Sequence, residues 1–269
     1  MGGKFQVRPI PVLMYHHVTQ HKGDMITVTP EVFDGQMRCL IQAGYRMLSV
    51  DELASYIAGE LILEQKAVVI TFDDGWLDNY LFAWPILKKY CIKAAVFVVT
   101  DWVEKASCEE PAIPVTVPVH SESKKLVSGG LCRRVILNWD LIGIMSGSGL
   151  VNFYSHTRSH AECGTLSPAA MADELTGSRS IIEERLKQPC PYLCWPKGKY
   201  NDLAVSAARD AGYKALFTTN AGVVTAGTDP LAIPRIVVKD NVGWFKKRLM
   251  IYSNALLSKC YLKIKKKSQ

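Results

Sequence analysis

The stretch that decides the fold reads Val68-Val69-Ile70-Thr71-Phe72-Asp73-Asp74-Gly75, an apolar run that ends in two carboxylates and a glycine. A short apolar run bounded by turn residues is typical of a buried strand. Active sites of parallel barrels form at the carboxyl ends of the strands, where neighbouring side chains point in different directions. One carboxylate can then bind a metal while the other stays free for proton transfer, although a turn with a helix-capping aspartate explains the same letters.

Strand-like and helical segments alternate along the chain on both sides of this stretch. Helix starts carry capping chemistry, as at Thr29-Pro30 and Ser167-Pro168, and Gly44 and Gly212 stand where helices end. Such alternation predicts a largely parallel sheet with crossover helices. Eight strands are expected, at 10–14, 45–49, 67–72, 94–99, 150–154, 192–195, 215–218 and 235–238, and six helices, at 30–43, 50–58, 78–90, 138–146, 168–186 and 202–211.

The chain has 269 residues, of which 48% are hydrophobic and 21% charged, so collagen-like, coiled-coil and disordered chains are excluded. Seven or eight strand–helix units within about 240 residues fit a closed or nearly closed α/β barrel. An open doubly wound sheet is the alternative, but no G-x-G-x-x-G follows the first strand. We assign the barrel to residues 8–238 and expect 103–134, rich in proline, glycine and paired charges, to be a long inserted loop over the barrel mouth.

Positive charge is concentrated at the C-terminus. Nine Lys or Arg residues and one acid, Asp240, lie in 239–269, so this basic tail carries +8 and the rest of the chain −1 of the formal net charge of +7. Aromatic residues and leucines interleave with the cations, which suits peripheral contact with an anionic membrane. A C-terminal helix packed on the body explains the pattern equally well. Nucleic-acid binding is not expected, because the body has no basic stripe and no recognition motif.

A second polar motif follows another predicted strand and reads Phe153-Tyr154-Ser155-His156-Thr157-Arg158-Ser159-His160. If this segment is a helical turn, the i, i+4 spacing lets both imidazoles face one point, as paired zinc ligands do. One carboxylate and two imidazoles leave coordination positions open for water and a substrate oxygen, which a hydrolytic metal needs. A lone histidine is more often structural, but two at this spacing together with an aspartate pair favour a metal site.

The motifs T-F-D-D-G at 71–75 and H-T-x-x-H at 156–160, in this order and each after a strand, resemble those of the polysaccharide deacetylases of carbohydrate esterase family 4, the NodB-homology fold. The resemblance covers about residues 8–238 and implies a distorted (β/α)7 TIM-like barrel that removes N-acetyl groups from amino sugars. By position it implies Asp73 as the general base. It also implies a divalent ion, Zn²⁺ first and Co²⁺ or Ni²⁺ as alternatives, with the ligands Asp74, His156 and His160.

A third motif, Cys194-Trp195-Pro196-Lys197-Gly198, resembles the W-P-x-G version of a family motif whose backbone N–H helps hold the oxyanion. The expected substrate or oxyanion contacts are therefore Pro196, Lys197 and Gly198, and the Lys197 side chain could place a cation near an acidic substrate. A simple turn is the alternative. The arginine usual in this motif is lost, and Arg235 could replace it by pairing with Asp73, or could form a purely structural salt bridge.

The general acid is expected at the first strand. The family's late L-x-H motif is missing, since no histidine follows His160. Instead, Met14-Tyr15-His16-His17-Val18 resembles the N-terminal Y-H-x-[IV] motif that biofilm-polysaccharide deacetylases use. His16 is then the expected acid and His17 the less favoured one, with Tyr15 as a substrate contact. A histidine that merely caps or packs the first strand is the alternative.

The expected function is removal of an N-acetyl group from an amino sugar, by resemblance a lipid-linked hexosamine or a lipopolysaccharide precursor in envelope glycan biosynthesis. Alternatives are a poly-N-acetylglucosamine exopolysaccharide as substrate, an O-acetyl ester or formamide as the bond, and a catalytically silent binding module. No secretory signal is evident near Met1, so we expect a cytoplasmic enzyme, peripheral on the inner face of the membrane. The eight cysteines are expected to be thiols, and a zinc knuckle at Cys190 and Cys194 is a weaker interpretation.

Overall fold

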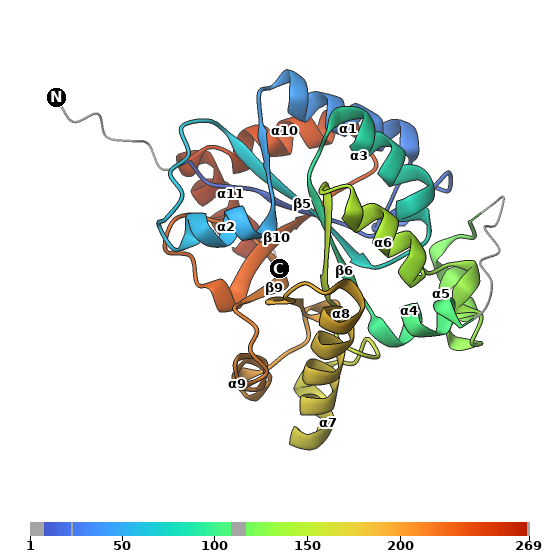
Figure 1. The fold of residues 1–269 in the computed structure, drawn as a ribbon. Coiled ribbons are helices and arrows are strands. Elements are labelled where there is room, and N and C mark those ends of the chain that lie inside the picture. The colour runs from blue at the N-terminus through green and yellow to red at the C-terminus, as the bar shows by residue number, and fades with distance from the viewer. Residues whose placement is uncertain (1–7, 23, 109–116, 268–269) are drawn as a thin grey trace.

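A ring of seven parallel strands forms the centre of the protein (Figure 1). The computed structural model describes residues 8–22, 24–108 and 117–267, apart from the side chains of 265–267. The ring closes because β1 pairs with β5 on one side (Leu13 beside Ile70) and with β10 on the other (Leu13 beside Ile236). In ring order the strands are β1 (Val12–Tyr15), β5 (Ala67–Asp74), β6 (Ala94–Val98), β7 (Val151–Ser155), β8 (Tyr192–Cys194), β9 (Ala215–Ala221) and β10 (Ile233–Val237).

Three further strands lie outside the ring. β4 (Arg46–Leu48) pairs with the first residues of β5, while β2 (His17–Val18) and β3 (Thr27–Val28) form a small sheet of their own. The (β/α)7 barrel expected from the sequence is therefore confirmed, with all eight predicted strands present. β5 runs two residues further than predicted, because Asp73 and Asp74 continue to pair with β6.

Helices cover the outside of the ring, and of the two caps that the sequence indicated, Ser167 makes a capping hydrogen bond and Thr29 does not. The side chains of Ser49, Asn138, Ser167 and Asn201 each accept a backbone N–H of the first helical turn. All six predicted helices are present, two of them with a π-helical turn, η1 (Asn79–Ala83) or η4 (Asp173–Gly177). They are α1 (Pro30–Gln42), α2 (Val50–Ile57), α3 (Trp84–Tyr90), α6 (Trp139–Gly147), α7 (Pro168–Ala172) with α8 (Ser178–Leu186), and α9 (Asp202–Asp210).

The inserted segment 103–134 is not the long loop that its prolines and charges suggested. Its described residues contain most of α4 (Thr100–Ser107), all of α5 (His120–Ser128) and a 3₁₀ turn, η2 (Cys132–Arg134). α4 becomes helical because it buries one face, with Val103 and Ala106 against the body. The part of the prediction at 109–116 lies outside the described residues. The segment thus places a second helix beside the carboxyl end of the barrel.

The basic tail forms two helices, α10 (Val242–Tyr252) and α11 (Ala255–Lys267). α10 packs along α1 and buries Phe245, Leu249 and Tyr252, so the first half of the tail is part of the body. α11 folds back on α10 and leaves Leu256 71% exposed. Among the described residues, no helix is long and apolar enough to cross a membrane.

Candidate metal centre

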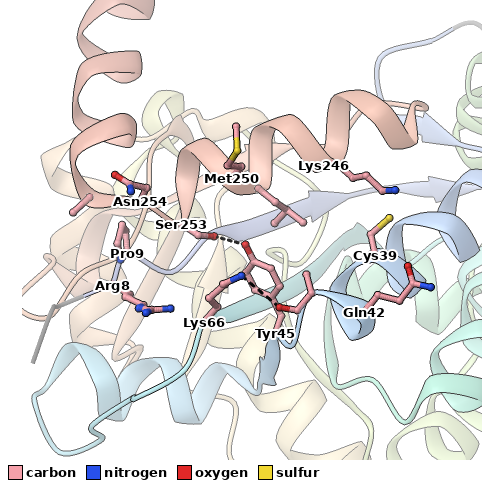
Figure 2. A pocket seen from close by; sticks show the side chains of 13 residues that line it. Arg8, Pro9, Cys39, Gln42, Tyr45, Lys66, Lys246, Met250, Ser253 and Asn254 are labelled. Carbon is pink, nitrogen blue, oxygen red and sulfur yellow. Dashed lines mark hydrogen bonds between the residues drawn. The ribbon is translucent and has the colours of Figure 1, made fainter.

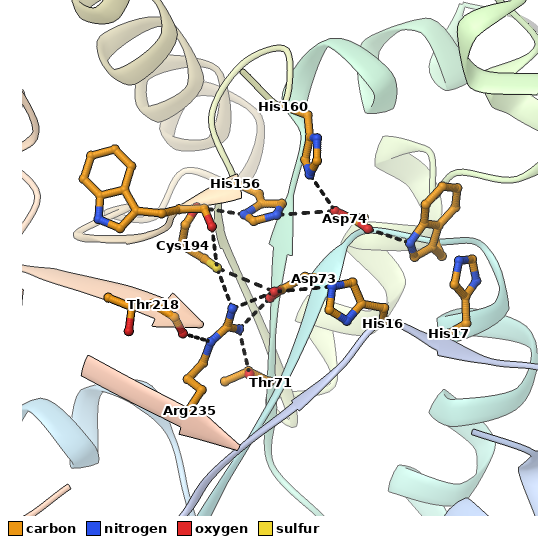
Figure 3. Close-up of polar contacts among 12 residues, drawn as sticks. His16, His17, Thr71, Asp73, Asp74, His156, His160, Cys194, Thr218 and Arg235 are labelled. Carbon is orange, nitrogen blue, oxygen red and sulfur yellow. Dashed lines mark hydrogen bonds and ion pairs between the residues drawn. The ribbon is translucent and has the colours of Figure 1, made fainter. Parts of the chain in front are cut away.

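The carboxyl ends of four strands bring the predicted site residues together (Figure 3). Asp73 and Asp74 end β5, His156 follows β7, Cys194 ends β8 and His16 follows β1. Because the strands are parallel, these ends meet at one edge of the ring. Arg235 reaches the same place from the middle of β10 and Thr218 from β9. The sequence prediction that remote motifs converge is therefore met for all the residues assigned to metal binding and proton transfer.

Asp74, His156 and His160 face one point. Both imidazole Nε2 atoms lie 3.3 Å from Asp74 Oδ1, and the three candidate ligand atoms are within 4.8 Å of one another. Asp74 Oδ1 is buried and accepts no hydrogen bond from any described residue, while Oδ2 accepts the indole N–H of Trp76 at 2.9 Å. A buried carboxylate oxygen without a hydrogen bond is costly unless another group, such as a cation, satisfies it.

The chemistry of this donor set fits a divalent metal. His156 Nδ1 lies 2.7 Å from the carbonyl oxygen of Cys194, so Nδ1 carries the proton and Nε2 presents its lone pair. Burial alone would raise the pKa of Asp74, but the imidazoles facing it bring that pKa well below its usual range. Two nitrogens and one ionised oxygen with room for further ligands are a set that Zn²⁺ binds in hydrolases, and Co²⁺ or Ni²⁺ accept the same donors.

The two histidines do not lie on a helical turn, which corrects the sequence interpretation. Residues 156–160 form an irregular loop in which Thr157 and His160 have left-handed backbones, with φ of 65° and 67°. Glu174 holds the loop by accepting the backbone N–H groups of Arg158 and Ser159 at 3.0 and 2.9 Å. Both imidazoles therefore converge through loop geometry and not through helical periodicity.

Asp73 is held by Arg235 and not by the histidine pair. Arg235 Nη1 and Nη2 donate to the two oxygens of Asp73 at 2.7 Å each, and both side chains are almost fully buried. Arg235 also donates to the carbonyl of Thr218 at 2.9 Å and to Thr71 Oγ1 at 3.2 Å. Burial opposes ionisation of Asp73, but the guanidinium outweighs it and lowers the pKa of the carboxyl. Asp73 is thus a fixed, ionised carboxylate beside the metal site.

Cys194 creates a second cluster of candidate ligands with Asp73 and His156. This cluster suits a metal less well, because both oxygens of Asp73 already accept from Arg235, and Arg235 Nη2 lies 2.9 Å from the thiol. Burial raises the pKa of the Cys194 thiol, which disfavours the thiolate that a metal requires. All eight cysteines are free, as expected, including the buried Cys190.

The two candidate acids have different surroundings. His16 Nε2 lies 3.8 Å from Asp73 Oδ2, and the His16 side chain is 18% exposed, so it can reach both Asp73 and a substrate. His17 points away from Asp73: its Nδ1 lies 2.5 Å from Asp78 Oδ2 and its Nε2 2.9 Å from His120 Nδ1. Of the two neighbours, only His16 is placed for proton transfer beside Asp73.

The third motif forms a tight 3₁₀ turn, η5 (Pro196–Gly198), beside the same edge. Lys197 has a left-handed backbone with φ of 54°, and its Nζ lies 2.7 Å from Glu162, so an acidic side chain already pairs with its charge. A Cβ at Gly198 would overlap Thr219 Oγ1, so only glycine fits there. The expected role of the Lys197 cation toward an acidic substrate is therefore not supported, whereas its backbone N–H keeps its proposed role.

Tyr15 does not contact the site, contrary to the sequence expectation. Its hydroxyl donates to Gln36 Oε1 at 2.8 Å inside the molecule, and its ring stacks on Phe72 with centroids 5.4 Å apart. Tyr15 is the last residue of β1 and His16 follows it, and consecutive side chains at a strand end point in different directions, so only His16 faces the site.

Several residues near the centre were missed from the sequence. Trp76 donates to Asp74, Trp102 lies 5.2 Å from the ring of His160, and His120 reaches His17 from α5. The tryptophan two residues after the Asp pair is a signal that could have been used. No local pattern marks Trp102, which lies on α4, or His120, which enters through the inserted segment.

Comparison with known proteins is consistent with this geometry. The polysaccharide deacetylase family matches residues 62–216, more than half of the chain. The Bacillus subtilis protein YxkH is 27% identical over 87% of this chain and 73% of its own length. The poly-β-1,6-N-acetyl-D-glucosamine N-deacetylase of Escherichia coli is 24% identical over 85% of this chain, which spans only 36% of that enzyme. The Streptococcus pyogenes deacetylase PplD, solved in complex with acetate, has a TM-score of 0.74 and 28% identity, over 88% of this chain and 95% of PplD. A matching family profile together with a shared barrel establishes that this chain belongs to the polysaccharide deacetylase family of hydrolases.

Proposed function

We propose that this chain hydrolyses the N-acetyl group of an amino sugar. The observation that carries the proposal is the difference between the surroundings of two adjacent carboxylates. Asp74 faces two imidazoles, whereas Asp73 pairs with Arg235. A hydrolase of this kind needs a metal-binding carboxylate and a separate proton acceptor within reach of the same bond. In this proposal two consecutive residues of β5 fill these two roles.

Asp74, His156 and His160 would hold the divalent ion, which when bound polarises the acyl carbonyl and makes water a better nucleophile. Asp73 accepts the proton of the attacking water. Arg235 keeps Asp73 ionised and fixes its orientation through two parallel hydrogen bonds. The backbone N–H of Lys197 donates to the oxygen that becomes negative, an interaction worth about 3–4 kcal/mol in enzymes of this kind.

His16 delivers a proton to the departing amine in this proposal. Burial lowers the pKa of His16 more than the nearby carboxylates raise it, so the free imidazole is neutral near pH 7. Its Nε2, 3.8 Å from Asp73, is placed to take up the proton that Asp73 removes from water and to pass it to the nitrogen. The proton released in the first step is thus used in the second.

The amino-terminal end of the barrel supports a second proposal, peripheral contact with an anionic membrane. A cavity of about 540 Å³ opens there between α1, α10 and the starts of β1, β4 and β5 (Figure 2). Among the residues that the structure describes, its lining includes Arg8, Lys66 and Lys246 and no acidic side chain. Met250 beside it is 63% exposed. Cations next to exposed apolar side chains favour the interface of an anionic bilayer.

The position of this basic end bears on the substrate. The lipid-linked hexosamine or lipopolysaccharide precursor expected from the sequence would lie at the bilayer surface. Contact through the amino-terminal end would turn the metal centre, at the carboxyl end, away from that surface. A poly-N-acetylglucosamine chain can reach the outward-facing end, and the name of the E. coli relative points to that polymer. We therefore favour an N-acetylglucosamine polymer over the lipid-linked sugar. A polymer outside the cell would conflict with the cytoplasmic location expected from the sequence, and cell fractionation decides between the two.

The test is release of acetate and free amine from N-acetylglucosamine oligomers and from a lipid-linked N-acetylhexosamine. The purified chain is first treated with a chelator and then reloaded with Zn²⁺, Co²⁺ or Ni²⁺. Metal-restored loss of one acetyl group per sugar supports the proposal, and preference for the oligomer supports the polymer. Acetate without free amine would identify an O-acetyl esterase, formate a deformylase, and binding without any product a silent module.

A further inference from the structure

Three titratable side chains that the proposed reaction does not use form a line beside the metal centre. Asp78 Oδ2 lies 2.5 Å from His17 Nδ1, and His17 Nε2 lies 2.9 Å from His120 Nδ1. Asp78 and His17 are buried, with 0% and 1% exposure, whereas His120 is only half-buried. The three residues come from segments more than forty residues apart in sequence, and a buried polar chain of this kind is costly unless every member is satisfied.

The line ends at the rim of the metal centre. His120 is the first residue of α5, and its ring lies 5.7 Å from that of Trp76. The same Trp76 stacks on His17 at 4.4 Å and donates to Asp74. A single side chain therefore separates His120 from a metal ligand. Trp102, 5.9 Å from Trp76 and 5.2 Å from His160, continues the wall on the other side.

The hydrogen bonds couple the ring protons of the two histidines. Asp78 is an acceptor, so His17 Nδ1 carries a proton. When His17 is charged, its Nε2–H donates to His120 Nδ1, and the neutral His120 then carries its proton on Nε2. When His17 is neutral, its Nε2 must accept, and His120 carries its proton on Nδ1. The charge of a buried histidine thus decides whether the rim presents a donor or an acceptor.

The shifts of both pKa values favour the donor form. Burial lowers the pKa of His17, but Asp78, helped by Asp74 and Asp24, outweighs burial and raises it. The pKa of His120 is lowered to about 4 by burial and by the charge of His17, with Lys124 acting in the same direction and Asp74 and Asp24 against it. A charged His17 next to a neutral His120 is the arrangement that follows.

We propose that His120 is a substrate-binding residue that donates its Nε2–H to a hydroxyl oxygen of the amino sugar at the metal centre, and that Asp78 and His17 are positioning residues that set its tautomer. This proposal rests on the proposed amino-sugar deacetylation. The inserted segment contributes a residue for substrate recognition, delivered by α5 and oriented by the core.

The first test separates binding from chemistry. Loss of one neutral hydrogen bond is worth about 1 kcal/mol, so His120→Ala should raise KM for an N-acetylglucosamine oligomer about fivefold to tenfold and change kcat much less. His120→Gln, which keeps an N–H donor, should recover part of the loss. His21→Ala is the matched control, because His21 also bonds to this segment, at the carbonyl of Val117, but lies outside the line. Equal KM values for His120→Ala and wild type would overturn the proposal.

The second test uses Asp78→Asn and a pH series. Asp78 Oδ1 accepts the N–H groups of Val18 and Asn79 at 3.1 and 2.9 Å, so the amide oxygen would keep those bonds and the amide NH₂ would face His17. His17 Nδ1 must then accept, and its Nε2 carries a proton at every pH. In the wild type KM should rise as pH passes the raised pKa of His17, whereas in Asp78→Asn this rise should be absent. Identical KM profiles would contradict the coupling.

A spectroscopic readout separates this proposal from the proposed function. Long-range ¹H–¹⁵N spectra of the histidine rings should show His120 protonated on Nε2 at neutral pH and on Nδ1 above the pKa of His17, with no switch in Asp78→Asn. Absence of the switch in the wild type would overturn the tautomer coupling even if the enzyme is active. Failure of the wild type to release acetate would overturn the proposed function, and the ring spectra would still decide the coupling.

Discussion

The two ends of the barrel differ in where their charges lie and in how they are neutralised. At the carboxyl end, Asp73 and Asp74 are buried and face either a guanidinium or two imidazoles. At the amino-terminal end, Arg8, Lys66 and Lys246 line an open cavity without an acid. Buried charges must be paired to be tolerated, whereas exposed cations cost little. The carboxyl end therefore holds buried charges at a high cost in stability, whereas the amino-terminal end can attract anions at almost no cost in stability.

Backbone geometry shows the same difference. Four non-glycine residues of the site segments have left-handed backbones, namely Asp74, Thr157, His160 and Lys197. The other two described residues of this kind, Cys91 and Lys187, end helices, where such a conformation is common. Left-handed non-glycine residues cost about 1–3 kcal/mol each and gather at functional sites. The carboxyl end therefore stores strain that the rest of the barrel must offset.

The largest effect is expected for Asp73→Asn. Loss of the proton acceptor should lower turnover roughly 10²–10⁴-fold while metal content stays near one ion per chain. The same change leaves Arg235 buried without a counter-charge, which costs about 3–5 kcal/mol of stability. Acetate release and metal analysis by mass spectrometry are the measurements.

The control for folding is the double variant Asp73→Asn/Arg235→Met, which removes both charges and should recover stability but not turnover. Asp74→Asn should lose the metal as well as turnover. If Asp73→Asn loses the metal and Asp74→Asn retains it, the two assignments at the end of β5 must be exchanged.

The acid sensitivity of the protein tests the Asp73–Arg235 pair at the level of stability. The pKa of Asp73 is lowered in the native state, so the pair stabilises the fold at pH values above the unfolded pKa of about 4. This contribution should be lost as pH falls below about 4 and through the lower native pKa. A native pKa that lies one pH unit below the unfolded one corresponds to about 1.4 kcal/mol of stability.

Urea unfolding between pH 3 and 7 measures this contribution. The double variant Asp73→Asn/Arg235→Met should show a shallower loss than the wild type. Asp34→Asn is the surface control: Lys89 and Arg38 also lower the pKa of Asp34, but both partners are more than half exposed, so Asp34→Asn should change the slope less than the double variant does. An unchanged slope in the double variant would mean that Asp73 is not the group that titrates.

Much of the fold could be predicted because it depends on local signals. The capping residue Ser167 and the predicted strand at 67–72 mark the boundaries of a helix and a strand within about two residues. The insertion was misinterpreted because Pro111, Pro114 and Pro118 are strong loop signals, whereas the helices depend on tertiary burial of residues such as Val103. The positions of turn residues do not indicate which side chains of a neighbouring helix will be buried.

The site was predictable as a set of residues and not as a geometry. Asp74, His156 and His160 follow from two motifs, but the loop that brings the histidines together depends on Glu174, a residue of the π-helical turn η4. His120 could not be found, because its role exists only through contact with His17 over a separation of 103 residues. Contacts of this range leave no periodicity in the sequence.

A smaller effect is expected for Gly198→Ala, which compares a left-handed glycine at the site with one elsewhere in the barrel. Its Cβ would overlap Thr219 Oγ1 and would also require a left-handed alanine, at φ of 65°. Gly44→Ala is the matched control, since Gly44 has φ of 68° and no atom within 4 Å of its Cβ position. The control should lose about 1 kcal/mol from backbone strain alone, and Gly198→Ala more, with lower turnover because the turn at Lys197 moves. Urea unfolding and acetate release measure the two effects, and equal losses would show that Thr219 gives way.

An effect on membrane binding alone, without loss of turnover, is expected at the amino-terminal end, where Lys66→Gln/Lys246→Gln removes two of the three cavity cations. Each cation near an anionic surface contributes about 1 kcal/mol, so binding to vesicles of phosphatidylcholine with phosphatidylglycerol should weaken roughly tenfold or more at low salt. Lys124→Gln/Lys125→Gln on α5 removes the same charge from the other side of the body and is the matched control. Vesicle co-sedimentation measures the binding.

Equal weakening by both pairs would mean that net charge alone drives association, and the cavity would then have no special role. If only Lys66→Gln/Lys246→Gln weakens binding, the protein docks with its amino-terminal end against the membrane. The metal centre then faces the solution and must take its substrate from there.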